Sequence, residues 1–456
     1  MRRLDPLSRW LMLFLAAVFA ATQPAAAQTI LRDSETEKLF ADMSKPLIEA
    51  AQLDPKNVKI VLINDPEINA FVTAGQAVYI HSGLITQADN ANQVQGVIAH
   101  ELGHIAGGHA LRGAEGAKQA TGISILSLVL GGLAMAAGAG DAAMGAMALG
   151  QQVALSQFLS FTRAQETSAD LAGAAYLGSA GISGQGSIQF FKKLQNQEYR
   201  LAVYATDSYN RTHPLSSERV ASLTQLYQKD PAWSRPTDPA VEARFQRVRA
   251  KLIGYISDKE AVLRTYPKSD TSIPAHYARA YAYHRMGDRD AAIKEADALL
   301  ATAPQDPFYL ELKGQILLES GRPTEALAPL RESVARAPDQ PMIQAMLGHA
   351  LLATEKTDNL SEAERVLKAS IGRDSEQPFA WYQLGMIYSA KGDLPRAALA
   401  TAERYSLQGE PKLALASAER ALKGIPQGTP DFLRAQDIAM VSRAEVEKDR
   451  KGRRKK

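Results

Sequence analysis

The second half of the chain repeats at intervals of 34 residues, and this period limits its fold more than any other feature. Gly287 recurs as Gly321 and Pro304 as Pro338. Further pairs at or near this spacing are Ala292 and Ala326, Leu347-Gly348 and Leu384-Gly385, and Ala363 and Ala397. A unit of two helices with glycine between them and proline at the end cannot bury its apolar face alone. Such units therefore stack into a curved solenoid with a concave groove.

One of these units carries a known signature. Residues 381–388, Trp-Tyr-Gln-Leu-Gly-Met-Ile-Tyr, match the W-x2-L-G-x2-Y pattern of the tetratricopeptide repeat (TPR). Four repeats are visible from Ile273, and residues 413–422 supply a weaker fifth helix. We predict an all-α TPR solenoid over residues 273–424, followed by a C-terminal helix and basic tail over residues 425–456. A generic helical bundle is the alternative, but it would not impose a constant period.

The chain begins with the pattern of a secretory signal peptide. Arg2 and Arg3 precede an apolar core over residues 11–21, and three alanines at residues 25–27 form a small-residue cleavage site. We predict a signal peptide over residues 1–27 and export from the cytoplasm. An uncleaved anchor is the alternative, although the core is shorter than the ~20 residues that span a bilayer.

The charge and cysteine content exclude several classes of protein. The chain has 52 basic and 49 acidic residues, and removal of residues 1–27 leaves 49 and 48, a net charge of +1. No global field attracts nucleic acid, so no nucleic-acid partner is expected. The basic run at residues 448–456 is interpreted as a solvated end rather than a docking patch. Because there is no cysteine, disulfides are excluded and any metal must be bound by histidines and carboxylates.

Residues 28–228 mix short β-rich runs with longer helical ones. The pattern predicts strands at residues 59–63, 69–73 and 77–80 and a helix from Gln93 to about Arg112. Prolines at positions 231, 236 and 239 then mark a linker, which we extend as linker helices over residues 229–272. The first domain is therefore mostly helical with a small sheet.

The segment His100-Glu101-Leu102-Gly103-His104 carries the chemistry. On a helix, positions i and i+4 lie on one face, so both imidazoles can bind one ion. Zinc lowers the pKa of a bound water toward ~7, and a neighbouring carboxylate can then take its proton. We predict one Zn²⁺ per subunit and Glu101 as the catalytic base. A structural helix with two surface histidines is the alternative.

A catalytic zinc needs a third protein ligand, and two candidates compete. A longer zinc motif, H-E-x-x-H-x-x-G-x-x-H, fits as far as Gly107, but Ala110 occupies its last position. The nearby His109 lies five residues past His104, about 140° around the helix, so we expect it to point away from the metal.

The other candidate is Glu166, which is the ligand that we predict. Asp170 lies one helical turn later on the same face, where it can hydrogen-bond a ligand histidine. An exposed acidic face is the alternative for this pair.

An apolar segment rich in glycine and alanine separates the two parts of this site. Residues 123–137 are mostly apolar, and a stretch containing Asp141 follows. The run is shorter than a membrane span needs to be. We interpret residues 121–150 as a buried or mobile helical hairpin, a lid over the active site. A surface that contacts lipid is the alternative.

The zinc helix, the later E-x-x-x-D helix and the strand Asn69-Ala70-Phe71-Val72 together resemble the M48 family of zinc peptidases. The resemblance implies a gluzincin-type α+β metalloprotease domain with zinc endopeptidase activity. When the signal peptide and the TPR array are included, the resemblance extends over nearly the whole mature chain. It then implies a periplasmic protease, alternatively peripheral to the outer membrane, that acts on misfolded or misassembled outer-membrane proteins. A chaperone-like role and association with the barrel-assembly machinery through the TPR groove are implied as well.

The resemblance also gives roles to five further residues. It implies that Asn69, Ala70 and Phe71 form an edge strand to which an extended substrate adds by main-chain hydrogen bonds. It implies that His213 occupies the fourth zinc position and blocks the resting site, whereas the residues alone suggest a donor to the oxyanion. Arg219 would steady this loop or the oxyanion.

Two other functions compete with the exported protease. One is a TPR scaffold or chaperone of outer-membrane assembly with a latent peptidase, and the other is a membrane-associated M48 protease. The complete set of His100, Glu101, His104 and Glu166 favours an enzyme. The membrane-associated protease rests on residues 121–150 alone.

Overall fold

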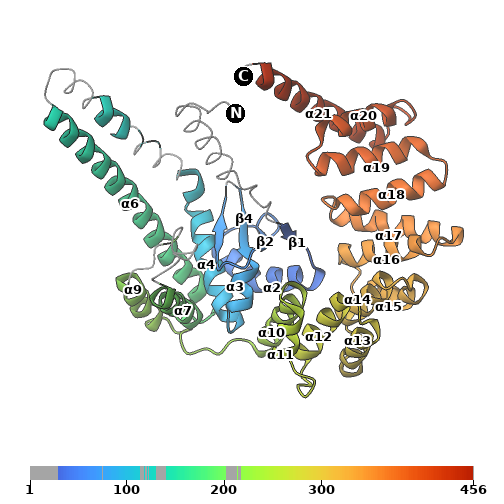
Figure 1. Cartoon of the computed structure of the whole chain (residues 1–456), viewed down its shortest axis with the longest axis horizontal. Coiled ribbons are helices and arrows are strands. Elements are labelled where there is room, and N and C mark those ends of the chain that lie inside the picture. Colours follow the sequence, from blue (N-terminus) through green and yellow to red (C-terminus); the bar gives the residue numbers. More distant parts are fainter. Residues whose placement is uncertain are drawn as a thin grey trace, which may run out of the picture.

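The computed structural model describes residues 29–454, except for 74, 113–117, 119–120, 122, 130–139, 202–212 and 214–216. The predicted signal peptide lies outside the described residues. The chain forms a mixed domain with a small sheet, followed by a long series of paired helices (Figure 1). The predicted fold class, an α+β domain followed by an all-α TPR solenoid, is confirmed.

A four-stranded sheet has the order β1-β2-β4-β3. The parallel pair β2–β4 lies at its centre, and β1 and β3 join it antiparallel. The strands are β1 (Thr29–Leu31), β2 (Lys59–Asn64), β3 (Ala70–Val72) and β4 (Ala77–His81). Three of them coincide with the predicted strands, whereas β1 was not predicted. Its three residues are too few to show the alternation by which a strand is recognised.

The helix that carries the zinc motif lies at the centre of the domain. In α4 (Ala91–Ala106), every residue from Ala91 to His104 is buried, and Asn90 caps the first turn by accepting a hydrogen bond from the Gln93 amide. Helix α2 (Ser34–Ala50) packs against it from the sheet side, and α3 (Ser82–Gln87) follows β4. This burial fixes the two histidines on a rigid element.

Two glycines end α4 earlier than the sequence pattern predicts. The predicted helix runs to about Arg112, but α4 ends at Ala106 and Gly107 caps it. Gly108 has φ +61°, a left-handed conformation that glycine adopts without steric cost, and residues 109–112 then form a separate helical turn. The prediction of one continuous helix is therefore wrong from Gly107 onward.

The longest helix of the domain supplies the other half of the site. Helix α6 (Gly140–Ser179) packs against α4 through its second half, and its first half extends away from the body (Figure 1). Glycine lets the two helices approach closely, since a Cβ on Gly103 would lie 2.6 Å from the Ala169 carbonyl oxygen. Helices α7 (Gln185–Leu201) and α9 (Ser217–Gln228) complete this side.

The apolar side chains in the described part of residues 121–150 are mostly exposed, so they do not form the buried hairpin that was one of the two predicted forms. Residues 123–129 run beside α6, with Ser127 against Gly150. Leu126, Met144 and Leu149 are each about 60% exposed. The physical reason is length, because α6 has 40 residues and α4 only 16, so the first turns of α6 pass beyond the elements that could cover them. Within the described part of the chain, no helix combines the length and the apolar composition that a bilayer crossing requires.

From Pro239 onward, the linker and the repeats consist of helices joined by short connections. Their helices are α10 (Pro239–Ile256), α11 (Lys259–Thr265), α12 (Ile273–Met286), α13 (Arg289–Thr302), α14 (Pro307–Glu319), α15 (Pro323–Arg336), α16 (Pro341–Ala353), α17 (Leu360–Arg373), α18 (Pro378–Ala390), α19 (Leu394–Leu407), α20 (Pro411–Leu422) and α21 (Pro430–Arg454), with the short η1 (Thr357–Asn359) before α17. Left-handed glycines such as Gly287 and Gly321 connect the paired helices. The repeats follow one another in an arc from α12 to α21 (Figure 1).

A buried polar network joins the first repeats to the peptidase-like domain. Tyr277 on α12 donates a hydrogen bond to Glu35 at the start of α2, with the two oxygens 2.8 Å apart. Lys251 on α10 forms ion pairs with Asp33 and Glu35. The hydroxyl of Ser34 lies 3.4 Å from the Glu311 carboxylate on α14. The start of α2, the linker and the first two repeats therefore share one buried interface.

Candidate metal centre

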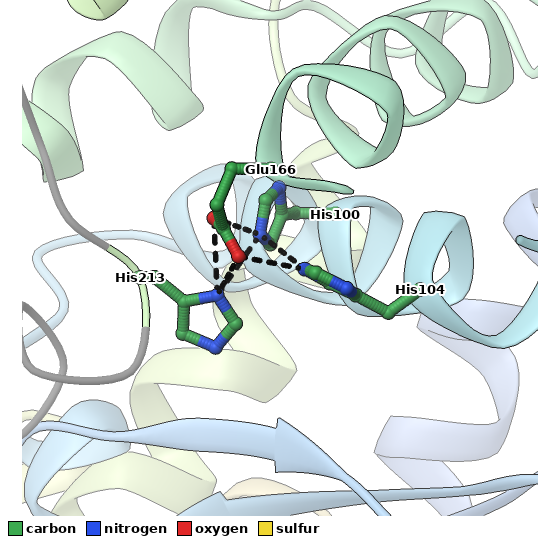
Figure 2. Close-up of side chains that lie close together, drawn as sticks. All are labelled: His100, His104, Glu166 and His213. Carbon is green, nitrogen blue, oxygen red and sulfur yellow. Dashed lines mark hydrogen bonds and ion pairs between the residues drawn. The ribbon is translucent and has the colours of Figure 1, made fainter. Parts of the chain in front are cut away.

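Four buried side chains from three segments converge on one point (Figure 2). Helix α4 supplies His100 and His104, α6 supplies Glu166, and His213 comes from the segment between α7 and α9. One ligand atom from each residue lies within 4.8 Å of all the others. The motifs predicted His100, His104 and Glu166 as ligands, the resemblance implied His213 beside them, and the structure brings the four together.

The distances identify which atoms face the centre. The Nε2 atoms of His100 and His104 are 3.1 Å apart and lie 3.4 and 3.3 Å from the Glu166 carboxylate. The Nδ1 atom of His213 lies 3.0 Å from Glu166 and 3.3 Å from His100 Nε2. The two imidazole nitrogens of α4 and the Glu166 carboxylate match the donor set of two histidines and one glutamate that zinc takes in some peptidases, so the residues present fit the ion. His213 adds a third nitrogen beside them.

The far side of His100 faces a second carboxylate. Its Nδ1 lies 3.0 Å from Oδ1 of Asp170, one turn after Glu166 on α6. Arg219 on α9 donates to Asp170 at 2.8 Å and forms an ion pair with Glu166 at 3.0 Å. The guanidinium thus offsets the repulsion between two buried carboxylates. The structure places Asp170 where an orienting partner of His100 must lie, and it places Arg219 against the carboxylates rather than free in the cavity.

The pKa values follow from this packing. Burial disfavours the charged form of each group, but contacts with Asp170 and Glu166 outweigh it at His100 and raise its pKa to about 10. For Glu166, burial opposes the charge, yet hydrogen bonds with His100, His104 and His213 hold the carboxyl pKa far below its usual range. Burial likewise opposes the charge of Asp170, and Arg219 and His100 lower its pKa. The centre therefore holds two carboxylates that stay ionised, as a cation requires.

Glu101 lies beside the centre rather than in it. Its side chain is fully buried, and Oε1 lies 3.6 Å from Nε2 of His213. Neither carboxylate oxygen accepts a hydrogen bond from any residue that the structure describes. A buried carboxylate without a donor is costly, and it is suited to accept a proton from a bound water.

His109 lies where the sequence did not predict it. It contacts His104 on the side of the ring opposite Nε2, with the two Nδ1 atoms 3.0 Å apart. As predicted, His109 is not among the residues that converge on the centre, but its ring does not point outward as a continuous helix would require, because the left-handed Gly108 turns the chain back toward His104. Burial, together with the neighbouring His104, lowers the pKa of His109 to about 4. The pair of glycines directly after the zinc motif was the signal that could have indicated this turn.

The predicted substrate residues form the edge of the sheet. Strand β3 is last in the strand order and packs against α4. Asn69 and Ala70 are buried, and Phe71 is half-buried with its ring stacked on Tyr79 at 5.3 Å. A cavity of about 660 Å³ lies on another side of the centre, between α6 and α9, and Glu166, Asp170 and Arg219 line it.

The chain is similar to known peptidases and repeat proteins. Residues 33–227 match the model of peptidase family M48, and residues 277–341 and 346–412 match a tetratricopeptide repeat model. The β-barrel assembly-enhancing protease of Escherichia coli K12 is 27% identical over 357 residues, which cover 76% of this chain and 71% of that protein. The corresponding protein of Yersinia pestis is 24% identical over 400 residues, 86% of this chain and 80% of its own length.

Other relatives match one part of the chain only. The metalloprotease LoiP of Escherichia coli K12 is 28% identical over 199 residues, 43% of this chain and 73% of LoiP. The crystal structure of YrrB, a TPR protein with an unusual peptide-binding site, covers 39% of this chain and 92% of YrrB at 21% identity, with a TM-score of 0.32. By these family models, residues 33–227 form a metallopeptidase domain of family M48, and tetratricopeptide repeats follow it.

Proposed function

We propose that the protein is an exported zinc endopeptidase that hydrolyses misfolded or misassembled outer-membrane proteins, with clients or partners bound by its repeats. The observation that carries the proposal is the convergence of His100, His104 and Glu166, with the buried carboxylate of Glu101 beside them. Relatives whose name states a role in β-barrel assembly support the outer-membrane part of the proposal.

His100, His104 and Glu166 would hold the ion, and each has a defined task. Zinc, when bound, acts as a Lewis acid on the peptide carbonyl and lowers the pKa of water. Asp170 accepts the Nδ1 proton of His100 and so keeps Nε2 free to bind the ion. Glu101 accepts a proton from the attacking water and returns it to the leaving amide nitrogen. Arg219 keeps Glu166 and Asp170 ionised and in place.

The substrate would lie along β3 as an added strand. Main-chain hydrogen bonds to an edge strand bind an extended peptide without regard to its side chains, which suits a protease of unfolded clients. Asn69 would hold the substrate backbone, and Ala70 and Phe71 would line the strand beside it. This orientation brings the peptide across α4, where the zinc residues lie.

His213 supports a resting state in which the centre is closed. Its Nδ1 would supply a fourth donor to a bound zinc, at the position that a catalytic zinc keeps open for water. A peptidase of this kind is latent until a client or partner moves His213 away. The same observation favours the second candidate function, a TPR scaffold or chaperone of outer-membrane assembly whose peptidase is mostly silent. A role of His213 as a donor to the oxyanion is the alternative for this residue.

Location and partners follow from three regions of the chain. The predicted signal peptide supports export to the periplasm. The repeats support association with clients and with the barrel-assembly machinery, as repeats of this type provide extended binding surfaces. The exposed apolar side chains of residues 123–129 and of the first half of α6 support peripheral contact with a membrane or with unfolded protein.

Degradation of casein or of an unfolded outer-membrane protein by the purified protein tests the activity. Glu101→Gln keeps the shape of the side chain but cannot take a proton, so we expect cleavage to fall by at least two orders of magnitude, the usual contribution of a general base. A zinc chelator should abolish cleavage. Glu49→Gln, on the exposed face of α2, is the matched control and should behave as the wild type. Full activity of Glu101→Gln would overturn the mechanism.

A further inference from the structure

His109 makes a contact that the proposed catalytic set does not use. Its ring lies 4.9 Å from the ring of His104 at an angle of 80°, and the two Nδ1 atoms are 3.0 Å apart. Both residues are buried. This separation is a hydrogen-bond distance, so one nitrogen donates a proton and the other accepts it.

Two glycines and two polar contacts build the position of His109. The left-handed Gly108 reverses the chain after α4 and brings the ring back over Gly107. The ring needs the space that Gly107 leaves, since a Cβ there would lie 2.3 Å from His109 Nε2. Arg112 donates to the Gly107 carbonyl, and Gln165 on α6 donates to the His109 carbonyl at 3.4 Å. Hydrogen bonds thus hold the turn on both sides.

The direction of the hydrogen bond decides whether His104 can bind a metal. Its Nε2 faces Glu166 and His100, so this atom must carry the free lone pair. In a neutral imidazole the proton then sits on Nδ1, which donates to Nδ1 of His109. If His109 were the donor, the proton of His104 would sit on Nε2 and exclude the ion.

We propose that His109 is a positioning residue, a neutral acceptor that selects the zinc-binding tautomer of His104 and fixes its ring. The inference rests on the proposed role of His104 as a zinc ligand. The two ligand histidines of α4 would then be oriented differently, His100 by the carboxylate of Asp170 and His104 by an imidazole. Orienting partners of ligand histidines commonly contribute roughly 10- to 100-fold to metal affinity.

A pair of substitutions separates the acceptor from the bulk of the side chain. His109→Asn puts an amide oxygen near the position of Nδ1, whereas His109→Leu fills a similar volume without an acceptor. We expect zinc affinity, measured by competition with a chromophoric chelator, to fall roughly 10- to 100-fold in His109→Leu and to stay within a few-fold of wild type in His109→Asn. Equal zinc affinity of His109→Leu and wild type would overturn the proposal, and so would an equal loss in both variants.

A substitution at Gly107 tests the same contact without removing a polar group. The backbone of Gly107 suits any residue, with φ −70°, so Gly107→Ala should fold but displace the His109 ring. We expect it to lower zinc affinity in the same direction as His109→Leu. In the His109→Leu background it should lower the affinity no further, because the contact is already lost. Additive losses would show that Gly107 acts by another route and would count against the proposal.

Two further measurements keep the inference separate from the proposed zinc site and from folding. His104→Ala removes the ligand itself, so an unchanged zinc affinity in that variant would contradict the site, not only the role of His109. A loss in His104→Ala without a loss in His109→Leu would contradict His109 alone. If His109→Leu does not fold, nitrogen NMR of wild-type zinc protein labelled at histidine decides the question. The proposal requires a scalar coupling across the hydrogen bond between the Nδ1 atoms of His104 and His109, with the proton on His104, and absence of this coupling would overturn it.

Discussion

Asp170 and Glu166 at the zinc centre are each held by partners on other elements, because an unpaired buried charge is costly. Asp170 lies between His100 and Arg219, so its charge is balanced on both sides. Glu166 contacts His213 and Arg219 as well as the two histidines of α4. A buried carboxylate that lost one of these partners would remain uncompensated, which typically costs 3–5 kcal/mol. Single substitutions here should therefore act on the whole centre.

Asp170→Asn tests the orienting role of this carboxylate. The amide cannot accept the Nδ1 proton of His100 as strongly, and it leaves Arg219 without one of its two carboxylates. We expect zinc affinity to fall roughly 10- to 100-fold. Chelator competition measures this directly. Asp42→Asn, on the exposed face of α2, is the control and should bind zinc as the wild type does. An unchanged zinc affinity in Asp170→Asn would show that Asp170 does not orient His100 for zinc binding.

His213→Ala separates the two roles of this histidine. If His213 closes the resting centre, its removal opens the fourth position, and cleavage of an unstructured peptide should rise several-fold with zinc affinity little changed. If His213 instead donates to the oxyanion, cleavage should fall by roughly 10²- to 10³-fold, the usual loss of one such donor. Initial rates with a quenched fluorescent peptide distinguish these outcomes. The combination His213→Ala with Glu101→Gln should be inactive in either case.

The sequence predicted the site where the chemistry is local and failed where it depends on a turn. His100, Glu101 and His104 follow from i, i+4 spacing on one helix, and so do Glu166 and Asp170 on another. The blocking role of His213 came only with the resemblance to a family, because the residues alone suggested a donor to the oxyanion instead. The contact of His109 was missed because a single left-handed residue, Gly108, redirects the chain. Helical geometry extrapolates along a helix, but not across a glycine that ends it.

At the level of elements, the centre depends on how closely α4 and α6 approach. Gly103 on α4 lies against Ala169 on α6, within one turn of the zinc residues. Gly173 on α6 also lies close to the backbone of Ala99, where a Cβ would be 3.1 Å away. The sequence showed both helices but not this contact, since helix packing across 60 or more residues leaves no periodic signal. Small residues at the contact are what allow Glu166 to reach both histidines.

Gly103→Ala tests this approach. A Cβ at this position would lie 2.6 Å from the backbone oxygen of Ala169, so the two helices must separate. We expect a loss of about 1–3 kcal/mol in the free energy of unfolding, as for other overpacked sites, together with weaker zinc binding. Chemical denaturation and chelator competition measure the two effects.

Gly372→Ala is the matched control for this substitution. Gly372 lies in α17, where a Cβ would meet nothing within 4 Å. Alanine should therefore stabilise the protein by about 0.5–1 kcal/mol, because glycine is the poorer helix former. A wild-type zinc affinity in Gly103→Ala would show that the separation of α4 and α6 does not limit the centre.

At the scale of the whole molecule, the repeats and the peptidase domain are joined by buried charges. Lys251 lies among Asp33, Glu35 and Glu311, and Arg247 pairs with Glu35 and Asp306. At the edge of the interface, the exposed pairs Arg32–Asp374 and Lys59–Glu376 add little, because solvent screens them. The sequence predicted the two parts but not their contact. Charged residues on a helix surface look alike whether they face solvent or a second domain.

Glu311 gives this interface a pH dependence. Burial raises the pKa of its carboxyl from 4.5 to about 8, so the folded protein binds a proton there that the unfolded chain releases above pH 4.5. The free energy of unfolding therefore falls as the pH rises from 4.5 to about 8, and above this range the folded state carries the full cost of a buried charge. Below pH 4.5 both states are protonated, and Glu311 has no effect on stability.

Glu311→Gln removes this dependence, since an amide stays neutral and can still accept the hydrogen bond from Ser34. We expect the Tm of the variant to equal that of the wild type at pH 4.5, to exceed it increasingly up to about pH 8, and to differ by a constant amount above that. Glu445→Gln, on the exposed surface of α21, should show no such divergence. A constant difference between Glu311→Gln and wild type across this range would mean that Glu311 is ionised in the folded protein. The buried network that joins the repeats to the peptidase domain would then include a charged Glu311 at neutral pH.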